Sequence, residues 1–281
     1  MDAKKLIGAL AIVAVLFSCK EAPKNWQLTD TVTLDGINPI GITSTDEGVW
    51  LSDGDHNRVV LVDEAGKIVK SIDSLERPMH IAANGNELFI PLYGNDEVWR
   101  YDSSLDQHLL PSKVQFSDSL DAPAGVWNRD GEIAIADFYN NRILFGSNDE
   151  WISFGKEGKS EGDFYYPTDV QVTEDAIWVA DAYNNRVQVF DKKGNFVKVI
   201  GADQKMNAAT GIFVSDSEVF VTDFENDRIL VFDHAGALKQ ELHDRIDKPT
   251  DVVVLNNRLY AVNYRNSLMN IFELKKASKT N

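Results

Sequence analysis

Cysteine is almost absent from this 281-residue sequence, in which Cys19 is the only one. A chain with one cysteine has no internal disulfide and no site made of several thiolates, so the stability of its fold must come from packing. The sequence also lacks a serine-nucleophile motif, a phosphate-binding loop and a heptad pattern. Residues 155–162 are rich in glycine, but they precede an expected strand and not the helix N-terminus that a phosphate site uses.

Basic residues are scarce compared with acidic ones. The chain has 28 Lys and Arg against 44 Asp and Glu, a formal net charge of −16. Without residues 1–18, 26 basic and 43 acidic residues remain, a net charge of −17. Such a charge repels phosphate backbones, so we expect no nucleic-acid partner. The alternative is that the acidic surface only favours solubility, which requires no binding partner.

The sequence has a single long apolar run, residues 6–17, which follows a pair of lysines. This run is too short to span a bilayer comfortably, and its basic start and apolar middle are typical of an export signal. Residues 16–19 resemble the bacterial lipobox, in which the cysteine is acylated. We therefore expect a lipoprotein-type signal peptide at 1–18, lipid on Cys19, a tether at 19–25 and a place in the bacterial cell envelope, periplasmic or surface-exposed. The alternative is that Cys19 is an odd buried thiol.

One motif recurs six times, about every 40 residues. Its copies begin at Pro39, Pro78, Pro123, Pro167, Ala209 and Pro249. Each copy continues with an alternating apolar run and then an acidic turn, and a fixed period of this length indicates an array of one supersecondary unit. Because no linker rich in proline or serine separates the copies, we expect one closed domain at residues 26–274, followed by a polar tail at 275–281.

The fourth copy shows what one unit contains. Four short runs rich in β-branched residues begin at residues 170, 177, 187 and 196, and turns separate them. Gly194 stands in the last turn, where a hairpin needs positive φ. The unit is therefore a four-stranded antiparallel meander, and six such sheets bury their faces when they stack radially. The sequence predicts an all-β fold, a six-bladed β-propeller of four-stranded antiparallel blades.

The sixth copy supplies only three strands, at residues 251–254, 258–262 and 268–274. An alternating segment that contains Trp26, Leu28, Val32 and Leu34 precedes the first copy. If this segment pairs with the last blade, no sheet edge is left open in the ring. We therefore predict that an N-terminal strand closes the propeller in its last blade.

The turn motif of the fourth copy is Asp-Ala-Tyr-Asn-Asn-Arg at residues 181–186, with near copies at 137–142 and 223–228. Together with the lead-in at residues 155–167, these motifs resemble the NHL repeat. The resemblance covers residues 26 to 274 and implies a propeller. It says less about function, because NHL propellers include enzymes, extracellular binders and RNA-binding modules.

The third residue of the lead motif alternates between glycine and a polar residue. In chain order the six copies carry Gly41, His80, Gly125, Asp169, Gly211 and Asp251. The polar residues fall on alternate blades and should face one another across the axis, where they are candidates to hold a divalent cation such as Ca²⁺ or Zn²⁺, or a polar ligand. The alternative is that each side chain bonds the backbone at the start of its own strand.

The turns also suggest sites. Asp53, Asp137, Asp181 and Asp223 are each followed five residues later by an arginine, a spacing that predicts a structural pair across each turn. Three neighbouring blades depart from this rule. The departures are Pro91 with Asp96 in blade two, Asn263 to Asn266 in blade six, and Asp55 with His56 in blade one. Exceptions to a repeated rule mark function or strain; the alternative is drift in a tolerant loop.

These departures give a candidate ligand-binding face. Its members are His56, His80, Tyr93, Asp169, Asp251, Tyr264 and Arg265, and Tyr139 and Tyr183 add to an aromatic rim. We expect a monomeric binding protein that presents this face to a peptide, glycan or protein and meets the membrane only through a lipid anchor. The alternative is a metal-dependent hydrolase or lyase, since within the NHL group amidating lyases bind zinc, and similar six-bladed lactonases bind calcium. With no catalytic motif present, we favour the binding protein.

Overall fold

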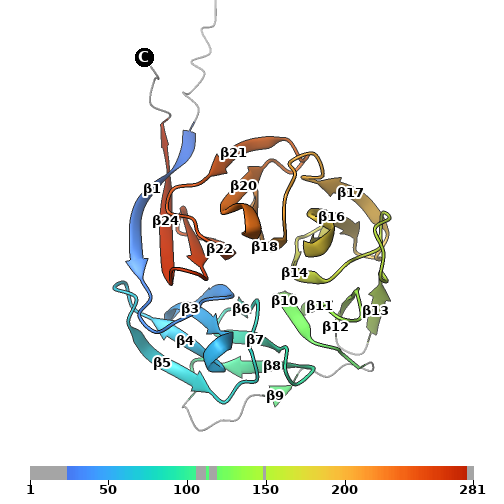
Figure 1. Cartoon of the computed structure of the whole chain (residues 1–281). Helices are drawn as coiled ribbons and strands as arrows, with labels where there is room; N and C mark the ends of the chain where they lie inside the picture. Colours follow the sequence, from blue (N-terminus) through green and yellow to red (C-terminus); the bar gives the residue numbers. More distant parts are fainter. Residues whose placement is uncertain (1–23, 106–111, 114–118, 148–149, 277–281) are drawn as a thin grey trace, which may run out of the picture.

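The computed structural model describes residues 24–105, 112–113, 119–147 and 150–276 of the chain. Six four-stranded antiparallel sheets stand around a central axis as the blades of a propeller (Figure 1). The predicted all-β, six-bladed fold is confirmed. Within the described residues, no helix has the length and apolar composition needed to cross a bilayer.

The blades follow chain order, each from its inner strand to its outer strand. Blade one comprises β2 (Ile42–Thr45), β3 (Gly48–Asp53), β4 (Arg58–Val62) and β5 (Ile68–Asp73). Blade two comprises β6 (Ala82–Asn84), β7 (Glu87–Leu92), β8 (Glu97–Asp102) and β9 (Ser112–Lys113). Blade three comprises β10 (Pro123–Arg129), β11 (Glu132–Asp137), β12 (Arg142–Ser147) and β13 (Glu150–Phe154). Blade four comprises β14 (Pro167–Val172), β15 (Ala176–Asp181), β16 (Arg186–Asp191) and β17 (Phe196–Ile200).

The last two blades complete the ring. Blade five comprises β18 (Ala209–Val214), β19 (Val219–Asp223), β20 (Arg228–Phe232) and β21 (Leu238–Leu242). Blade six comprises β22 (Pro249–Leu255), β23 (Arg258–Asn263), β24 (Leu268–Lys276) and, as its outer strand, β1 (Lys24–Thr33). Short 3-10 turns at Gly54–His56, Ala182–Asn184 and Phe224–Asn226 follow the second strands of blades one, four and five.

Strand β1 closes the ring as the sequence predicts. It pairs antiparallel with β24, with Trp26 opposite Leu274 and Val32 opposite Met269 (Figure 1). The pairing runs from Lys24 to Lys276. Blade six therefore leaves no long unpaired edge at the join, which removes a site for edge-to-edge aggregation.

The hydrophobic core is divided into six clusters, one between each pair of neighbouring blades. Between blades three and four, for example, Ala136 and Phe145 pack with Val170 and Phe190. Successive residues of a strand point to opposite faces of its blade. Both faces of each blade are covered because a neighbouring blade lies on each side. Packing between sheets thus stabilises a chain that lacks disulfides.

Candidate functional site

The inner strands begin at the same end of the ring at which the second strands end. Pro123 at the start of β10 pairs with Asp137 at the end of β11, and Pro167 pairs with Asp181 in the next blade. We call this end the upper face. The polar residues of the lead motif and the acidic turns both belong to it, so the candidate residues lie at one end of the molecule.

The alternating glycines of the lead motif allow neighbouring inner strands to approach closely. A Cβ on Gly125 would lie 2.7 Å from Asp169 Cα, and one on Gly211 would lie 2.8 Å from Asp251 Cα. A Cβ on Gly41 would likewise lie 2.8 Å from His80 Cα. These distances are far below van der Waals contact. The glycines of blades one, three and five therefore make room for the backbones that carry the three polar side chains.

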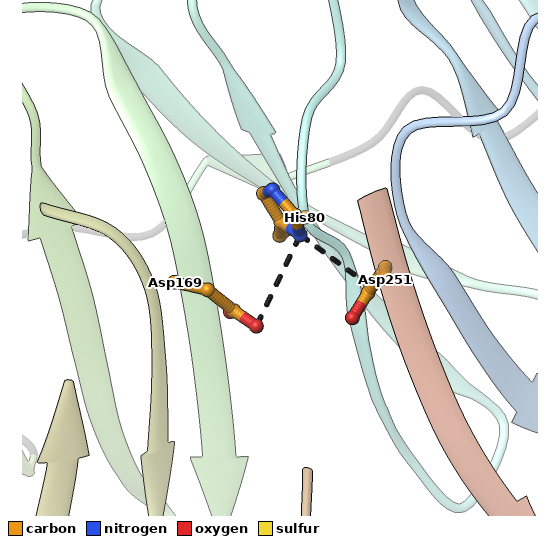
Figure 2. Close-up of side chains that lie close together, drawn as sticks. All are labelled: His80, Asp169 and Asp251. Atoms are coloured by element: carbon orange, nitrogen blue, oxygen red, sulfur yellow. Dashed lines mark ion pairs between the residues drawn. The ribbon is translucent and has the colours of Figure 1, made fainter. Parts of the chain in front are cut away.

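His80, Asp169 and Asp251 converge on the axis from blades two, four and six (Figure 2). His80 Nδ1 lies 3.5 Å from Asp251 Oδ2 and 3.9 Å from Asp169 Oδ2. All three residues are buried, with exposed fractions of 3%, 6% and 4% in chain order. The sequence predicts that these residues face one another, and the structure brings them together.

Both carboxylates also bond the backbone, as the structural alternative proposes. Asp169 accepts hydrogen bonds from the amides of Val170 at 2.8 Å and of Ile212 in the next blade at 2.9 Å. Asp251 does the same with Val252 at 2.8 Å and with Ile42 at 3.0 Å. Each carboxylate thus ties its own blade to the following one. His80 differs, because its Nδ1 is buried without a hydrogen-bond partner.

The charges of Asp169 and Asp251 affect the pKa of His80, and those of His80 and Asp251 affect the pKa of Asp169. Burial lowers the pKa of His80, but the nearby charges of Asp169 and Asp251 outweigh it and hold the pKa above its ordinary value. Burial raises the pKa of Asp169 to about 7, against the opposing attraction of His80. The cluster can therefore hold a proton between its members at neutral pH. Its three ligand-type atoms all lie within 4.8 Å of one another, so it can also hold a metal ion.

A cavity of about 30 Å³ adjoins the two carboxylates. Its other lining residues are almost all apolar and include Ile42, Ile81 and Ile212. This volume is enough for about one water molecule. A substrate of ordinary size does not fit in this cavity.

The turn aspartates form structural pairs, as the sequence predicts. The arginine Nε lies 2.8, 2.7, 2.8 and 2.6 Å from the aspartate Oδ2 in blades one, three, four and five. In blade four, Asp181 is fully buried and also accepts hydrogen bonds from Tyr165 N, Asn184 and Gln188. The repeated pairs therefore fasten the corner of each of these four blades to its lead-in loop.

The predicted register of blade two is wrong by one residue. Pro78 pairs with Leu92, and Leu92 pairs with Glu97, so Leu92 and Glu97 occupy the aspartate and arginine positions, not Pro91 and Asp96. Asp96 has a φ of 56° and accepts a hydrogen bond from Ala122 N at 2.8 Å. Asn141 has a φ of 52° and accepts from Tyr166 N in the same way. The lack of an acidic–basic pair in blade two remains, but Asp96 is part of the repeated scaffold.

Aromatic side chains gather on the upper face over blades two to four. We call this group the tyrosine cluster, and its members are Tyr93, Phe138, Tyr139, Tyr165, Tyr166 and Tyr183. Successive ring centroids lie 4.6 to 5.8 Å apart. Tyr139 and Tyr183 are 48% and 58% exposed, and the Arg77 guanidinium lies 4.9 Å from the Tyr93 ring centroid.

Three members of the cluster were not predicted from the sequence. Phe138 and Tyr166 stack at 4.7 Å, and Tyr165 stacks on Tyr166 at 4.6 Å. Tyr165 and Tyr166 directly precede Pro167, and the residue before the lead proline has positive φ in several blades, including Arg77 and Lys248. Such residues project from the loop that joins two blades at the upper face.

The other predicted residues lie on the opposite side of the same face. Tyr264 donates a hydrogen bond to Asp55 Oδ2 at 2.7 Å, which joins blade six to blade one. His56 Nδ1 lies 2.8 Å from Asp53 Oδ1 and thus belongs to the corner of blade one. Arg265 is exposed and lines a cavity of about 400 Å³ with Tyr264, and its other lining residues are Asn38, Phe224 and Lys248.

The predicted binding residues thus fall into separate places: the axial cluster, the tyrosine cluster with Tyr93, and the side with His56, Tyr264 and Arg265. They do not form one continuous pocket in the described chain. Cys19 lies outside the described residues.

The sequence of the fourth blade matches the profile of a known protein family. The profile of the NHL repeat matches residues 164–190, which contain β14, β15, the 3-10 turn at Ala182–Asn184 and most of β16. Residues 164–190 are an NHL repeat. This NHL segment includes the buried corner Asp181 and the exposed Tyr183.

A stretch of 47 residues is 47% identical to protein lin-41 of Caenorhabditis elegans, and it covers 16% of this chain and 4% of lin-41. Among solved structures, streptogramin B lyase is similar with a TM-score of 0.64 and 15% identity over 90% of this chain and 89% of that one. Virginiamycin B lyase from Staphylococcus aureus is similar with a TM-score of 0.64 and 14% identity, over 89% of this chain and 100% of that one. BamB from Moraxella catarrhalis is similar with a TM-score of 0.57 and 9% identity, over 90% of this chain and 99% of that one. These likenesses show the propeller fold that the NHL segment belongs to.

Proposed function

We propose that this protein is a binding propeller of the bacterial cell envelope, tethered by lipid on Cys19, which presents the tyrosine cluster to a peptide segment of a protein partner. The observation that carries the proposal is the exposure of this cluster. Six rings in mutual contact span three blades, and Tyr139 and Tyr183 are about half exposed.

The chemistry of the cluster suits protein recognition. Tyrosine is enriched in binding hot spots because it offers a large, rigid contact area and a polar tip at low cost in side-chain entropy. The ring contacts fix each side chain before a partner arrives, which reduces the entropy lost on binding. Burial and the neighbouring Tyr139 raise the pKa of Tyr93 above its ordinary value.

Selection of peptides that bind the purified propeller, from a displayed library of random sequences, tests the proposal. We expect enriched peptides whose affinity falls more than about tenfold when Tyr139 and Tyr183 are both replaced by alanine, because removing two hot-spot rings costs at least about 2 kcal/mol. Val69→Ala is the matched control, since Val69 is 59% exposed on the outer strand of blade one. Peptides that bind the double variant as tightly as the wild type would exclude the cluster as the site. Enrichment of glycans alone on a parallel array would replace the peptide by a sugar ligand.

The tether is tested separately. In cells fed a labelled fatty acid, the wild-type protein should carry the label and partition into detergent, and Cys19→Ser should lose both properties. An unlabelled wild-type protein in the aqueous phase would contradict the anchor without bearing on the tyrosine cluster.

A metal-dependent lyase or hydrolase at the axis is the second candidate. It is supported by the convergence of His80, Asp169 and Asp251 and by the fold shared with two lyases. Against it stand the burial of all three residues and the small volume of the adjoining cavity. Screening the metal-loaded protein for lactonase, esterase and streptogramin-lyase turnover decides: turnover that His80→Gln abolishes would establish the enzyme.

A further inference from the structure

We propose that the axial cluster is a structural metal site, in which His80 Nδ1, Asp169 Oδ2 and Asp251 Oδ2 bind one divalent transition-metal ion of the Zn²⁺ type. The site joins blades two, four and six across the centre of the ring. Such an ion acts on the stability of the propeller and is independent of the partner proposed above.

On the axis, two buried carboxylates face a single basic side chain. Two carboxylates lie there with exposed fractions of 6% and 4%. In the described part of the chain, the only basic side chain within 4.0 Å of either carboxylate is that of His80. Buried charges without full compensation are costly, and a bound cation is one of the ways in which proteins compensate them. A divalent ion balances both carboxylates.

His80 supplies a ligand atom that makes no hydrogen bond. Its Nδ1 is buried, lacks a hydrogen-bond partner and points between the two carboxylates (Figure 2). A buried nitrogen left without a partner costs free energy, because water no longer solvates it. Coordination of a metal ion by this nitrogen satisfies it. The carboxylates are also held by backbone hydrogen bonds, whereas His80 Nδ1 faces only the two carboxylates.

The ligands are held in place before an ion arrives. Each carboxylate oxygen that faces His80 already accepts one amide hydrogen bond, from Ile212 N to Asp169 and from Ile42 N to Asp251. A carboxylate oxygen has a second lone pair for a metal, and hydrogen bonds of this kind fix the orientation of metal ligands. The lead-motif glycines of blades one, three and five hold the three backbones close together. Moving a ligand therefore requires moving an inner strand.

The distances and the ligand types select the class of ion. Tetrahedral coordination with bonds of about 2.1 Å places neighbouring ligand atoms about 3.4 Å apart. The observed separations from Nδ1 are 3.5 and 3.9 Å, close to this value, and all three ligand atoms lie within 4.8 Å of one another. One nitrogen, two oxygens and room for about one water make a four-coordinate set, whereas Ca²⁺ takes six to eight oxygen ligands. This ligand number favours a Zn²⁺-type ion over calcium.

Zn²⁺ titration of the full chain, first stripped with a chelator, is the test. We expect one Zn²⁺ per chain and, at a free Zn²⁺ concentration of about 100 times the Kd, a rise in Tm of about 5 to 10 °C. His80→Gln should weaken Zn²⁺ binding more than about 100-fold, because loss of a ligand costs more than loss of an orienting partner. His243→Gln is the matched control, since this histidine is exposed and lies 3.3 Å from Glu241 alone.

Three results would overturn the site: no saturable Zn²⁺ binding, binding that His80→Gln leaves unchanged, or Ca²⁺ bound at least as tightly as Zn²⁺. If His80→Gln does not fold, a crystal of the wild-type protein soaked in Zn²⁺ replaces it. Anomalous density within about 2.3 Å of Nδ1 and both Oδ2 atoms supports the site. A soaked crystal without density on the axis rejects it.

Discussion

The indole Nε1 of Trp26 donates a hydrogen bond of 2.9 Å to Oε2 of Glu218. Trp26 belongs to β1, which completes blade six, whereas Glu218 belongs to blade five. Gln240 of blade five reinforces this link, since its side chain accepts from Trp26 N at 2.9 Å and donates to Trp26 O at 2.7 Å. The Trp26 ring also packs edge-on against Phe220, with centroids 5.6 Å apart. The closing strand is therefore attached to two blades.

Replacing Trp26 by alanine should lower the free energy of unfolding by about 3 to 5 kcal/mol, because it empties a buried aromatic position and weakens ring closure. Chemical denaturation measures the change. Trp26→Phe keeps a ring against Phe220 but loses the hydrogen bond to Glu218, so its loss should be clearly smaller. Equal losses in the two variants would mean that the hydrogen bond, and not packing, holds the strand.

Replacing Asp181 by alanine should also lower the free energy of unfolding by about 3 to 5 kcal/mol, because it leaves the Arg186 charge without its buried partner. Asp191→Ala is the control. Asp191 accepts backbone amides in an exposed turn, so its removal should cost at most about 1 kcal/mol in the same denaturation experiment. A cost for Asp181→Ala no larger than that of the control would contradict the structural role of the corner pairs.

A methyl group at Gly125 should destabilise the ring. Gly125→Ala places a carbon 2.7 Å from Asp169 Cα and from Thr168 O, where only backbone movement can relieve the contact, and we expect a loss of about 3 kcal/mol or more. Gly85 has a φ of 60°, and a methyl group added there would meet nothing within 4 Å. Gly85→Ala should therefore cost only the conformational strain, about 1 kcal/mol. Thermal unfolding of both variants checks the order, and the reverse order would show that the inner strands adjust freely.

The axial cluster should make the metal-free protein more stable at mildly acidic pH. The raised pKa of His80 contributes stability that is complete below about 6.5 and is lost as the pH rises through the higher folded value. The raised pKa of Asp169, about 7, acts in the same direction, because the folded state keeps a proton that the unfolded chain releases above the ordinary pKa of 3.8. Asp251 is the other charged group that faces them.

Measurement of Tm from pH 5 to 8 in chelator should therefore show a decline with pH for the wild type. The overall acidic charge adds a decline of its own, so the comparison is with the double variant His80→Gln, Asp169→Asn, whose profile should be flatter. Parallel profiles would show that the cluster exchanges no proton over this range.

Much of the architecture was predictable because the repeat fixes it. The period gives the number of blades, and the missing strand after Leu274 together with the alternation around Trp26 gives the closure. Equal positions in equal blades must face one another, so the meeting of His80 with Asp169 and Asp251 was also predictable. These features need only the register of the repeat.

The predictions that were wrong or incomplete concern single residues, whose positions the period of the repeat does not fix. The prediction for blade two is wrong by one residue because it places Asp96 at the arginine position, whereas the positive φ of Asp96 belongs to the preceding scaffold position. The predicted aromatic rim is incomplete because Tyr165 and Tyr166 reach it from a lead-in loop, whose path the strand pattern does not describe. The burial of His80 depends on glycine packing in a neighbouring blade, which is visible only in three dimensions.

The pairing of Lys24 with Lys276 has a consequence for engineering. Because these residues are partners at the outer rim, a short peptide bridge between them should allow the backbone to be cut between any two other blades. Such a circular permutant keeps all six sheets, but every blade would then be formed from one continuous stretch of chain. Its ring would be closed only by side-chain packing between the two blades at the cut, so its stability relative to the wild type would measure what closure by a shared strand contributes.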